Sequence, residues 1–247
     1  MQQTDQNQDR CLNSSEWFAF PPDRVNLICL PQAGGDTSAF YRWDHGLQGR
    51  ITMTPARLTE PPFRTMGQLV KALSRGSMEL RKSRYVILSA SMGAWVGYEL
   101  CPRIKQAGET LPEMLVVLAA GTPFEPSALA SFELDDRASA IQSLAAFNPD
   151  FTPAFEYPEL VDLLLLANAA DFVQCVNYSL TARRRIAAPM LAWANIHDDI
   201  VKPEPVEKRP AFTSAGFELN FVEDGPSFFE RPPESLLALV RRHACRS

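Results

Sequence analysis

One serine in the sequence is flanked by small residues in a way that suits a nucleophile. Tyr85–Leu88 is an apolar run, and the segment Ser89–Gly93 follows it directly. The spacing is typical of the G-x-S-x-G turn between a strand and a helix, where strained backbone holds a serine hydroxyl clear for attack on a carbonyl carbon. That serine is Ser91, and Ser89 takes the place of the usual first glycine. A second interpretation is that Ser91 only caps the helix beginning at Met92.

A glycine-rich turn, Gln32-Ala33-Gly34-Gly35, follows an earlier apolar run, Val25–Leu30. Glycines in such a turn let backbone N–H groups approach an oxyanion. We therefore expect the amides of Ala33 and Met92 to hold the oxyanion that would form when Ser91 attacks. An ordinary strand-to-helix turn is the alternative interpretation.

These two turns fit into a regular alternation of elements. Apolar runs predict strands at 25–30, 51–58, 85–88, 111–119, 189–194 and 217–222, and helical spacing predicts helices at 36–48, 66–81, 94–105 and 233–245. The alternation predicts an α/β fold with a mostly parallel sheet covered by helices on both faces. The stretch 125–185 is helical but broken by prolines, so we expect an inserted cap over the carboxyl ends of the strands.

Composition narrows the classes of function. The 247 residues are enough for one domain, 1–247, and carry 24 Lys+Arg against 29 Asp+Glu, a net charge of −5 that argues against nucleic acid. The densest basic run, Arg183–Arg185, predicts a solvated face or a docking surface. No apolar stretch approaches the ~20 residues of a membrane span, and the polar N-terminus lacks a secretory pattern.

Cysteine and histidine usage points to a cytoplasmic protein without a metal. The five cysteines are scattered and include no Cys-x-x-Cys pair, which is typical of a reducing compartment. The cluster His197-Asp198-Asp199 does not supply three convergent ligands, so we expect neither a metal nor a cofactor.

Several segments, in order, resemble the stand-alone (type II) thioesterases of polyketide and nonribosomal peptide pathways. They cover nearly the whole chain: Leu27–Gly35 resembles the strand and P-H-A-G-G loop, Phe40–Trp43 the F-Y-R-x-W motif, Glu60–Phe63 the segment before the next helix, Leu88–Leu100 the G-H-S-M-G-A elbow, Asp171–Phe172 an acidic-aromatic pair, Asn195–Val201 the G-x-x-D-x-x-V motif, and Gly225–Phe229 the G-G-H-F-F motif.

The resemblance implies an α/β-hydrolase fold and a set of roles. Ser91 would be the nucleophile and Asp198 the triad acid, while Gln32 and Phe172 would contact substrate. The implied partner is an acyl or peptidyl carrier protein whose phosphopantetheine holds the substrate.

The chain departs from the family pattern at its histidines. The triad histidine falls at Ser227, the histidine before the nucleophile at Ala90, and the loop histidine at Gln32. Serine is not a base near neutral pH. In subtilisin, loss of the histidine alone lowers turnover about 10⁶-fold. Ser91 is therefore expected to be an inefficient hydrolytic nucleophile unless another base reaches it.

Among the three histidines, His197 is the candidate substitute base because it adjoins Asp198. His45 and His243 are expected on solvated helix surfaces. Asp198 has the alternative role of capping the turn that follows it. Aromatic residues of the cap are expected either to pack against the core or to line an acyl channel: Phe151, Phe155, Tyr157 and Phe172.

Three hypotheses for function remain open from the sequence. The protein is a thioesterase-like enzyme that uses Ser91, with His197 or the substrate as base. It is alternatively a cyclase or isomerase that uses the same pocket without hydrolysis, with Asp198 as a working carboxylate. In the third hypothesis it is a catalytically silent relative that binds a carrier protein or a synthase.

Overall fold

The fold is built on a sheet of parallel strands. The computed structural model describes residues 24–35, 37–47, 49, 51–58, 63, 65–120, 136–147, 149–178, 184–197, 212–223 and 231–244. Its strands are β1 (Val25–Leu30), β2 (Ile51–Pro55), β3 (Tyr85–Ala90), β4 (Leu115–Leu118), β5 (Met190–Asn195) and β6 (Phe217–Val222). They lie in the order β2-β1-β3-β4-β5-β6, and every pair is parallel. This confirms the predicted α/β fold.

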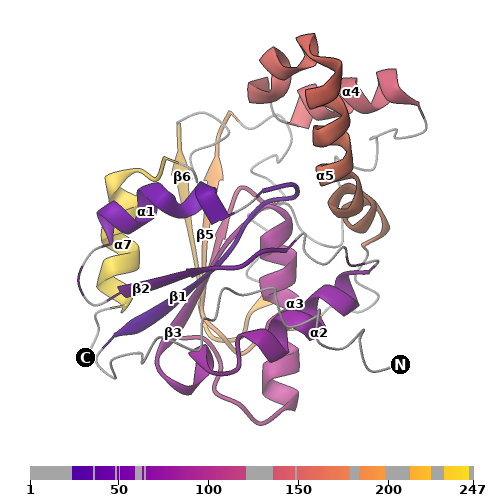
Figure 1. Ribbon diagram of the computed structural model, residues 1–247. Helices are drawn as coiled ribbons and strands as arrows, with labels where there is room; N and C mark the ends of the chain where they lie inside the picture. Colours follow the sequence, from indigo (N-terminus) through magenta and orange to yellow (C-terminus); the bar gives the residue numbers. More distant parts are fainter. Residues whose placement is uncertain are drawn as a thin grey trace, which may run out of the picture.

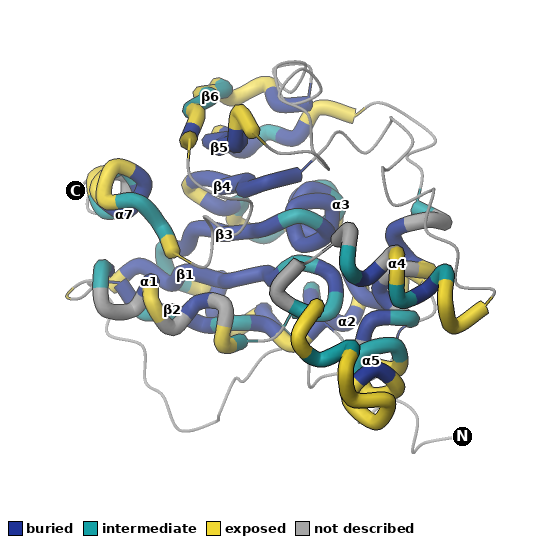
Figure 2. The backbone as a smooth tube through the Cα atoms, turned by 90° about the horizontal axis from the view of Figure 1, so that it is seen from above, coloured by how far each residue is buried: buried dark blue, intermediate teal, exposed yellow. Residues whose placement is uncertain are grey.

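Helices cover both faces of the sheet, as Figure 2 shows. One face carries α1 (Tyr41–Gly46), which follows the short 3-10 helix η2 (Thr37–Phe40), and α7 (Glu234–Ala244). The other carries α2 (Met66–Gly76) and α3 (Met92–Gln106). Alternate residues of each strand point to opposite faces, so the core is divided into two clusters. In β1, for example, Ile28 packs with the first cluster and Leu27 with the second.

A helical insertion lies between β4 and β5. It consists of α4 (Arg137–Phe147), the 3-10 helix η5 (Pro149–Glu156) and α5 (Pro158–Asn177). In Figure 1 these helices stand above the sheet on the side of α2 and α3. These helices fall within the cap expected at 125–185, whose two ends, 125–135 and 179–183, lie outside the described residues, and the assignment of a cap stays a prediction.

Four elements differ from the sequence prediction, and the helix expected at 36–48 is divided into η2 and α1, which ends at Gly46. The helix expected at 66–81 ends at Gly76, where the Ser77 N–H bonds to the Leu73 carbonyl, and a separate 3-10 helix η3 follows at Leu80–Lys82. The strand expected at 51–58 ends at Pro55, one residue before the Ala56 N–H donates to the Cys29 carbonyl at 2.8 Å. The strand expected at 111–119 begins only at Leu115.

Three cysteines in the described part of the chain, Cys29, Cys101 and Cys175, are buried free thiols. None of the described helices is long and apolar enough to span a bilayer. Within the same residues, no three His, Cys, Asp or Glu side chains gather in a way that could hold a metal ion.

Candidate functional site

Ser91 occupies the sharp turn between β3 and α3. Its backbone has φ 48° and ψ −117°, and it is one of two non-glycine residues with positive φ in the described chain. Such a conformation costs about 1–3 kcal/mol and persists only where the surroundings enforce it. The Ser91 side chain is partly exposed and makes no capping hydrogen bond to α3. The interpretation of Ser91 as a side-chain cap is therefore wrong, because its hydroxyl is not committed to the helix.

The turn is held by the ends of neighbouring strands. The Ser91 N–H donates to the Leu118 carbonyl at 2.9 Å, and Ala119, with φ 45°, donates its N–H to the Trp193 carbonyl at 3.1 Å. Strained backbone thus recurs at the ends of β3 and β4, on one edge of the sheet. The sequence gives no signal for the strain at Ala119.

Ser89 replaces the first glycine of the motif without leaving a buried hydroxyl unsatisfied. Its side chain is fully buried, and its Oγ donates to the Val116 carbonyl at 2.5 Å. The substitution is tolerated because the adjacent strand β4 supplies the acceptor.

Gly93 brings the glycine-rich loop against the turn. A Cβ on Gly93 would lie 2.3 Å from the Leu30 carbonyl oxygen and 2.6 Å from that of Pro31. Backbone can approach this closely only because glycine has no side chain. The end of β1 and the start of α3 are consequently in direct contact, which places the loop after β1 beside the turn that carries Ser91.

The two predicted oxyanion donors lie in this contact region. Met92 is the first residue of α3, so its N–H has no acceptor within the helix. Ala33 is buried in a turn that closes with a 3.0 Å hydrogen bond from the Gly35 N–H to the Gln32 carbonyl. The Gln32 side chain packs against Gly35, where a Cβ would lie 2.7 Å from the Gln32 Oε1. The oxyanion role of these amides stays a prediction.

The helical insertion reaches the same loop through α5. The Gly34 N–H donates to Asp171 Oδ2 at 2.8 Å, and Asp171 is 1% exposed. Gly34 has φ 65°, and a Cβ there would lie 1.5 Å from Asn168 Oδ1. Position 34 therefore requires glycine for its backbone and also for the space that Asn168 occupies. Asp171 was noted in the sequence only as part of the resemblance, and neither it nor Asn168 was predicted as a site residue.

Asp171 is electrostatically unusual. Burial raises the pKa of its carboxyl from 3.8 to about 6, and the hydrogen bond from the Gly34 backbone opposes that rise. Asp171 Oδ1 and Asn168 Oδ1 have no hydrogen-bond partner in the described part of the chain. A carboxyl that titrates near 6 next to the loop of Ala33 is the kind of perturbed group that collects at functional sites.

The remaining predicted residues are placed as follows. His197 is exposed in the turn after β5, and its backbone N–H donates to Asn195 Oδ1 at 2.9 Å. Asp198 and Ser227 lie outside the described residues. Phe172 belongs to α5, but its side chain is not among those described. The proposed roles of these four residues stay predictions.

Other side chains also take definite places. Phe151 and Phe155 pack against the core cluster on the α2–α3 face, whereas Tyr157 is 56% exposed. Arg184 pairs with Glu99 at 2.8 Å, and Arg185 is exposed. Arg183 and the side chains of His45 and His243 fall outside what the structure describes.

Comparisons with known proteins agree on one family. Residues 25–214 match the thioesterase domain. The chain is 27% identical over 191 residues to the gramicidin S biosynthesis protein GrsT of Aneurinibacillus migulanus, covering 74% of this chain and 75% of GrsT. It is 25% identical over 215 residues to the thioesterase PikA5 of Streptomyces venezuelae, covering 83% of this chain and 75% of PikA5.

A solved structure shows the same fold. RedJ, a thioesterase from the prodiginine pathway of Streptomyces coelicolor, superposes with a TM-score of 0.78 at 24% identity, covering 93% of this chain and 98% of RedJ. With most of its length matched, the chain belongs to the thioesterase domain family.

Proposed function

We propose that this protein is a type II thioesterase of a nonribosomal peptide or polyketide pathway, acting on an acyl or peptidyl thioester attached to the phosphopantetheine of a carrier protein in the cytoplasm. GrsT is named for gramicidin S biosynthesis and RedJ for the prodiginine pathway, and YbtT, a protein of similar fold, is named a type II thioesterase of the yersiniabactin NRPS/PKS pathway. The single observation that carries the proposal is the strained turn at Ser91, whose hydroxyl makes no bond to the helix it precedes.

The proposed reaction starts with attack by Ser91 Oγ on the thioester carbonyl carbon. The C–O bond forms, the C–S bond breaks, and the serine proton ends on the departing thiol, which leaves an acyl-serine and a free phosphopantetheine. The amides of Ala33 and Met92 stabilise the oxyanion in between. Water then hydrolyses the acyl-serine to a carboxylic acid and restores the hydroxyl.

The two halves of this reaction depend differently on a base. A thiol has a pKa near 8.5 and leaves readily as thiolate, so acylation needs a base for the Ser91 proton but no acid for the leaving group. Hydrolysis of the acyl-serine requires activation of water, which the histidine position of the family, here Ser227, does not supply. We therefore expect acyl-enzyme to accumulate and turnover to be slow, with His197 as the candidate base.

The helical insertion is proposed to be the lid of this site. Its α5 contacts the loop that holds Ala33 through Asp171, so the same hydrogen bond fixes both the lid and the oxyanion loop. In this arrangement Asp171 is a positioning residue.

The decisive experiment is incubation with a panel of acyl-carrier thioesters, with intact-mass measurement of the protein and quantification of released acid. The wild type is expected to gain the mass of the acyl group, and Ser91→Ala is expected to gain none. Ser89→Gly is the matched control, because it removes the other hydroxyl of the turn and keeps the nucleophile. Product formed by Ser91→Ala at the wild-type rate would instead indicate a cyclase or isomerase, and no turnover with retained carrier binding would indicate a silent relative.

A gain-of-function variant tests the missing base. Ser227→His is expected to speed hydrolysis of the acyl-enzyme by about 10²-fold or more, within the range that a positioned general base contributes. His197→Ala is expected to slow the residual hydrolysis in the wild type and to have little effect in Ser227→His. An unchanged deacylation rate in both variants would contradict the assignment of these positions.

A further inference from the structure

A cavity of about 350 Å³ lies away from the turn of Ser91. It opens to solvent and lies between the start of α2, the second half of α3, the end of α5 and Arg184, with the lining residues Thr65, Met66, Gly67, Val70, Glu99, Pro102, Arg103, Gln106, Gln174, Tyr178 and Arg184. Glu99 follows Ser91 by eight residues along α3, about 12 Å at 1.5 Å per residue. The cavity is therefore distinct from the nucleophile and has the size of a small-molecule site.

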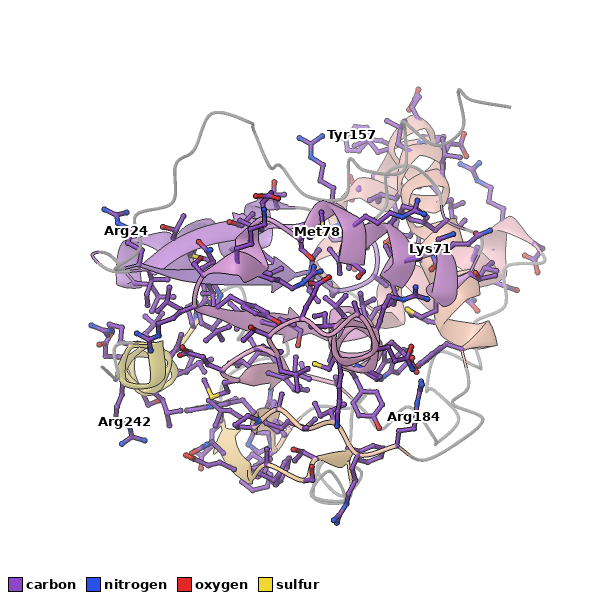
Figure 3. All side chains as sticks on the ribbon, turned by 90° about the horizontal axis from the view of Figure 1, so that it is seen from below. Arg24, Lys71, Met78, Tyr157, Arg184 and Arg242 are labelled. Atoms are coloured by element: carbon purple, nitrogen blue, oxygen red, sulfur yellow. The ribbon has the colours of Figure 1, made fainter. Side chains whose placement is uncertain are left out.

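The charges around the cavity favour an anion. Arg184 is paired with Glu99 at 2.8 Å, and Glu99 also accepts a 2.9 Å hydrogen bond from the Tyr178 hydroxyl. Arg103 is exposed at the rim and forms no ion pair with any other described residue. Among the described residues that line the cavity, two arginines accompany one glutamate, so these side chains carry a net positive charge. Figure 3 shows Arg184 on the side of the sheet opposite Arg242 of α7.

One wall of the cavity carries an unsatisfied amide. Gln174 of α5 is 3% exposed, and neither its Nε2 nor its Oε1 has a hydrogen-bond partner in the described part of the chain. Leaving a buried donor and a buried acceptor without partners costs about 1–3 kcal/mol for each. Both atoms are without exposed surface in this structure, so a ligand that offers one carbonyl and one N–H on the same edge would relieve both costs once the amide turns toward the cavity.

The remaining lining is partly apolar, with Thr65 and Gln106 as its polar side chains. Met66 and Val70 present side chains from α2, and Pro102 contributes from α3. The Tyr178 ring stacks on Trp95 with ring centroids 5.5 Å apart, so the aromatic wall is held in place. These surfaces suit an aliphatic side chain rather than a second charged group.

We propose that this cavity binds a short N-acylated peptide that ends in a free carboxylate. The carboxylate pairs with Arg103, and the N–H and C=O of one extended residue pair with the Gln174 amide. The aliphatic side chain of that residue packs on Met66 and Val70. The proposal concerns binding alone and does not depend on the activity of Ser91.

The test uses N-acetyl-leucyl-alanine as probe, with binding measured by titration calorimetry and by tryptophan fluorescence. Saturable binding is expected with a Kd of about 0.2–1 mM, the range of ligand efficiency for a molecule of this size. The C-terminal amide of the same dipeptide, which lacks the negative charge, is expected to bind at least about tenfold more weakly. The Trp95→Phe variant is expected to bind the probe but to lose most of the fluorescence change.

Three variants assign the contacts. Arg103→Gln is expected to weaken binding about tenfold and to abolish the preference for the free carboxylate. Gln174→Met keeps the size of the side chain and is expected to weaken the binding of both peptides about equally. Lys71→Gln is the matched control, because it removes a positive charge from the exposed surface of α2 without touching the cavity lining.

Each other outcome would overturn the proposal. Absence of saturable binding to the wild type would mean that the cavity holds only water. Equal affinity for the acid and its amide, or an equal loss in Lys71→Gln and Arg103→Gln, would show that the carboxylate is not recognised at Arg103. Thermal denaturation of every variant establishes that the protein is folded in the comparison.

Discussion

Strand β3 and helix α5 both contribute to the surroundings of the site, but they distribute polarity in opposite ways. All six residues of β3 are buried, and the hydroxyls of its two polar side chains, Tyr85 and Ser89, each have a hydrogen-bond acceptor. Helix α5 buries Asn168, Asp171 and Gln174, each with an unpartnered polar atom. On its exposed surface it carries apolar side chains: Leu160, Leu163, Leu166 and Val173. In Figure 2 strand β3 is dark blue, whereas much of α5 is yellow.

Strand β3 therefore mainly stabilises the fold, whereas helix α5 mainly brings polar side chains to the glycine-rich loop and to the cavity. Hydrophobic burial is the dominant favourable contribution to folding, and β3 supplies it. The buried face of α5 supplies little and instead directs polar groups at Gly34 and at the cavity. Elements with few buried apolar contacts open more easily than the core does. We therefore expect α5 to unfold or shift at lower cost than the sheet.

The largest expected contrast is between two leucines. Leu88→Ala in β3 truncates a fully buried side chain and is expected to lower the free energy of unfolding by about 2–5 kcal/mol. Leu166→Ala in α5 truncates a side chain that is 77% exposed and is expected to change it by less than about 0.5 kcal/mol. Denaturant titration of both variants measures the difference. Similar losses for the two would contradict the contrast between β3 and α5.

A second prediction compares Gly93 of α3 with Gly67 of α2. Both α2 and α3 begin with Met-Gly, and Gly93→Ala is expected to destabilise by about 3 kcal/mol because its Cβ would meet backbone carbonyls. At Gly67 the nearest atom is the Thr65 hydroxyl oxygen at 4.0 Å. Gly67→Ala is therefore the control and is expected to stabilise by about 0.5–1 kcal/mol. A Gly93→Ala variant as stable as Gly67→Ala would disprove the close contact.

The third prediction concerns how the stability of the protein depends on pH through Asp171 of α5. Because burial raises the pKa of Asp171 to about 6, the folded state holds its proton more tightly than the unfolded state does. The contribution of this carboxyl to stability is complete below about pH 4 and is lost as pH rises to about 6. Asp171→Asn is expected to remove this loss, amounting to about 2–3 kcal/mol, while keeping an oxygen for the Gly34 N–H.

Denaturant titrations of wild type and Asp171→Asn between pH 4 and pH 8 measure that effect. The difference between the two proteins is expected to grow with pH up to about 6 and then to stay constant. Parallel stability curves over the whole range would exclude a raised pKa at Asp171.

The smallest expected effect is local to the end of α5. Tyr178→Phe removes the hydrogen bond to Glu99 and is expected to cost about 1 kcal/mol, seen as faster hydrogen exchange in the last turns of α5. Tyr85→Phe is the matched control, since it removes a 2.6 Å bond to the Thr110 carbonyl and leaves α5 untouched. Equal acceleration of α5 exchange in both variants would contradict a local role for Tyr178.

Much of the sheet and of the turn that carries Ser91 could be predicted from local sequence patterns. The strand before Ser91, the small residues around it and the glycines after β1 all act within a few residues of one another, so their sequence is informative. The register that places Gly93 against Leu30 is not local, and neither is the strain at Ala119. The edges of elements were also uncertain, as the early end at Gly76 shows, because capping bonds decide them.

The helical insertion was harder to predict because α5 exposes apolar side chains and buries polar ones, the reverse of the usual arrangement. Leucines spaced along α5 suggest a buried face, yet several are exposed and the polar residues are buried. The sequence drew attention to Phe172 and the aromatic residues as candidates for substrate contact. It gave no reason to choose Asp171, because the partner of that carboxyl, Gly34, is 137 residues away.

The sequence by itself determined a strand, a tight turn carrying Ser91 and a following helix, since an apolar run ending in small residues has few other conformations open to it. Only the tertiary structure decided that α5 meets the loop of Gly34 and that a cavity forms beside Gln174. Contacts of this kind depend on how whole elements pack. Packing is set by the shape and burial of many side chains together, which no short stretch of sequence records.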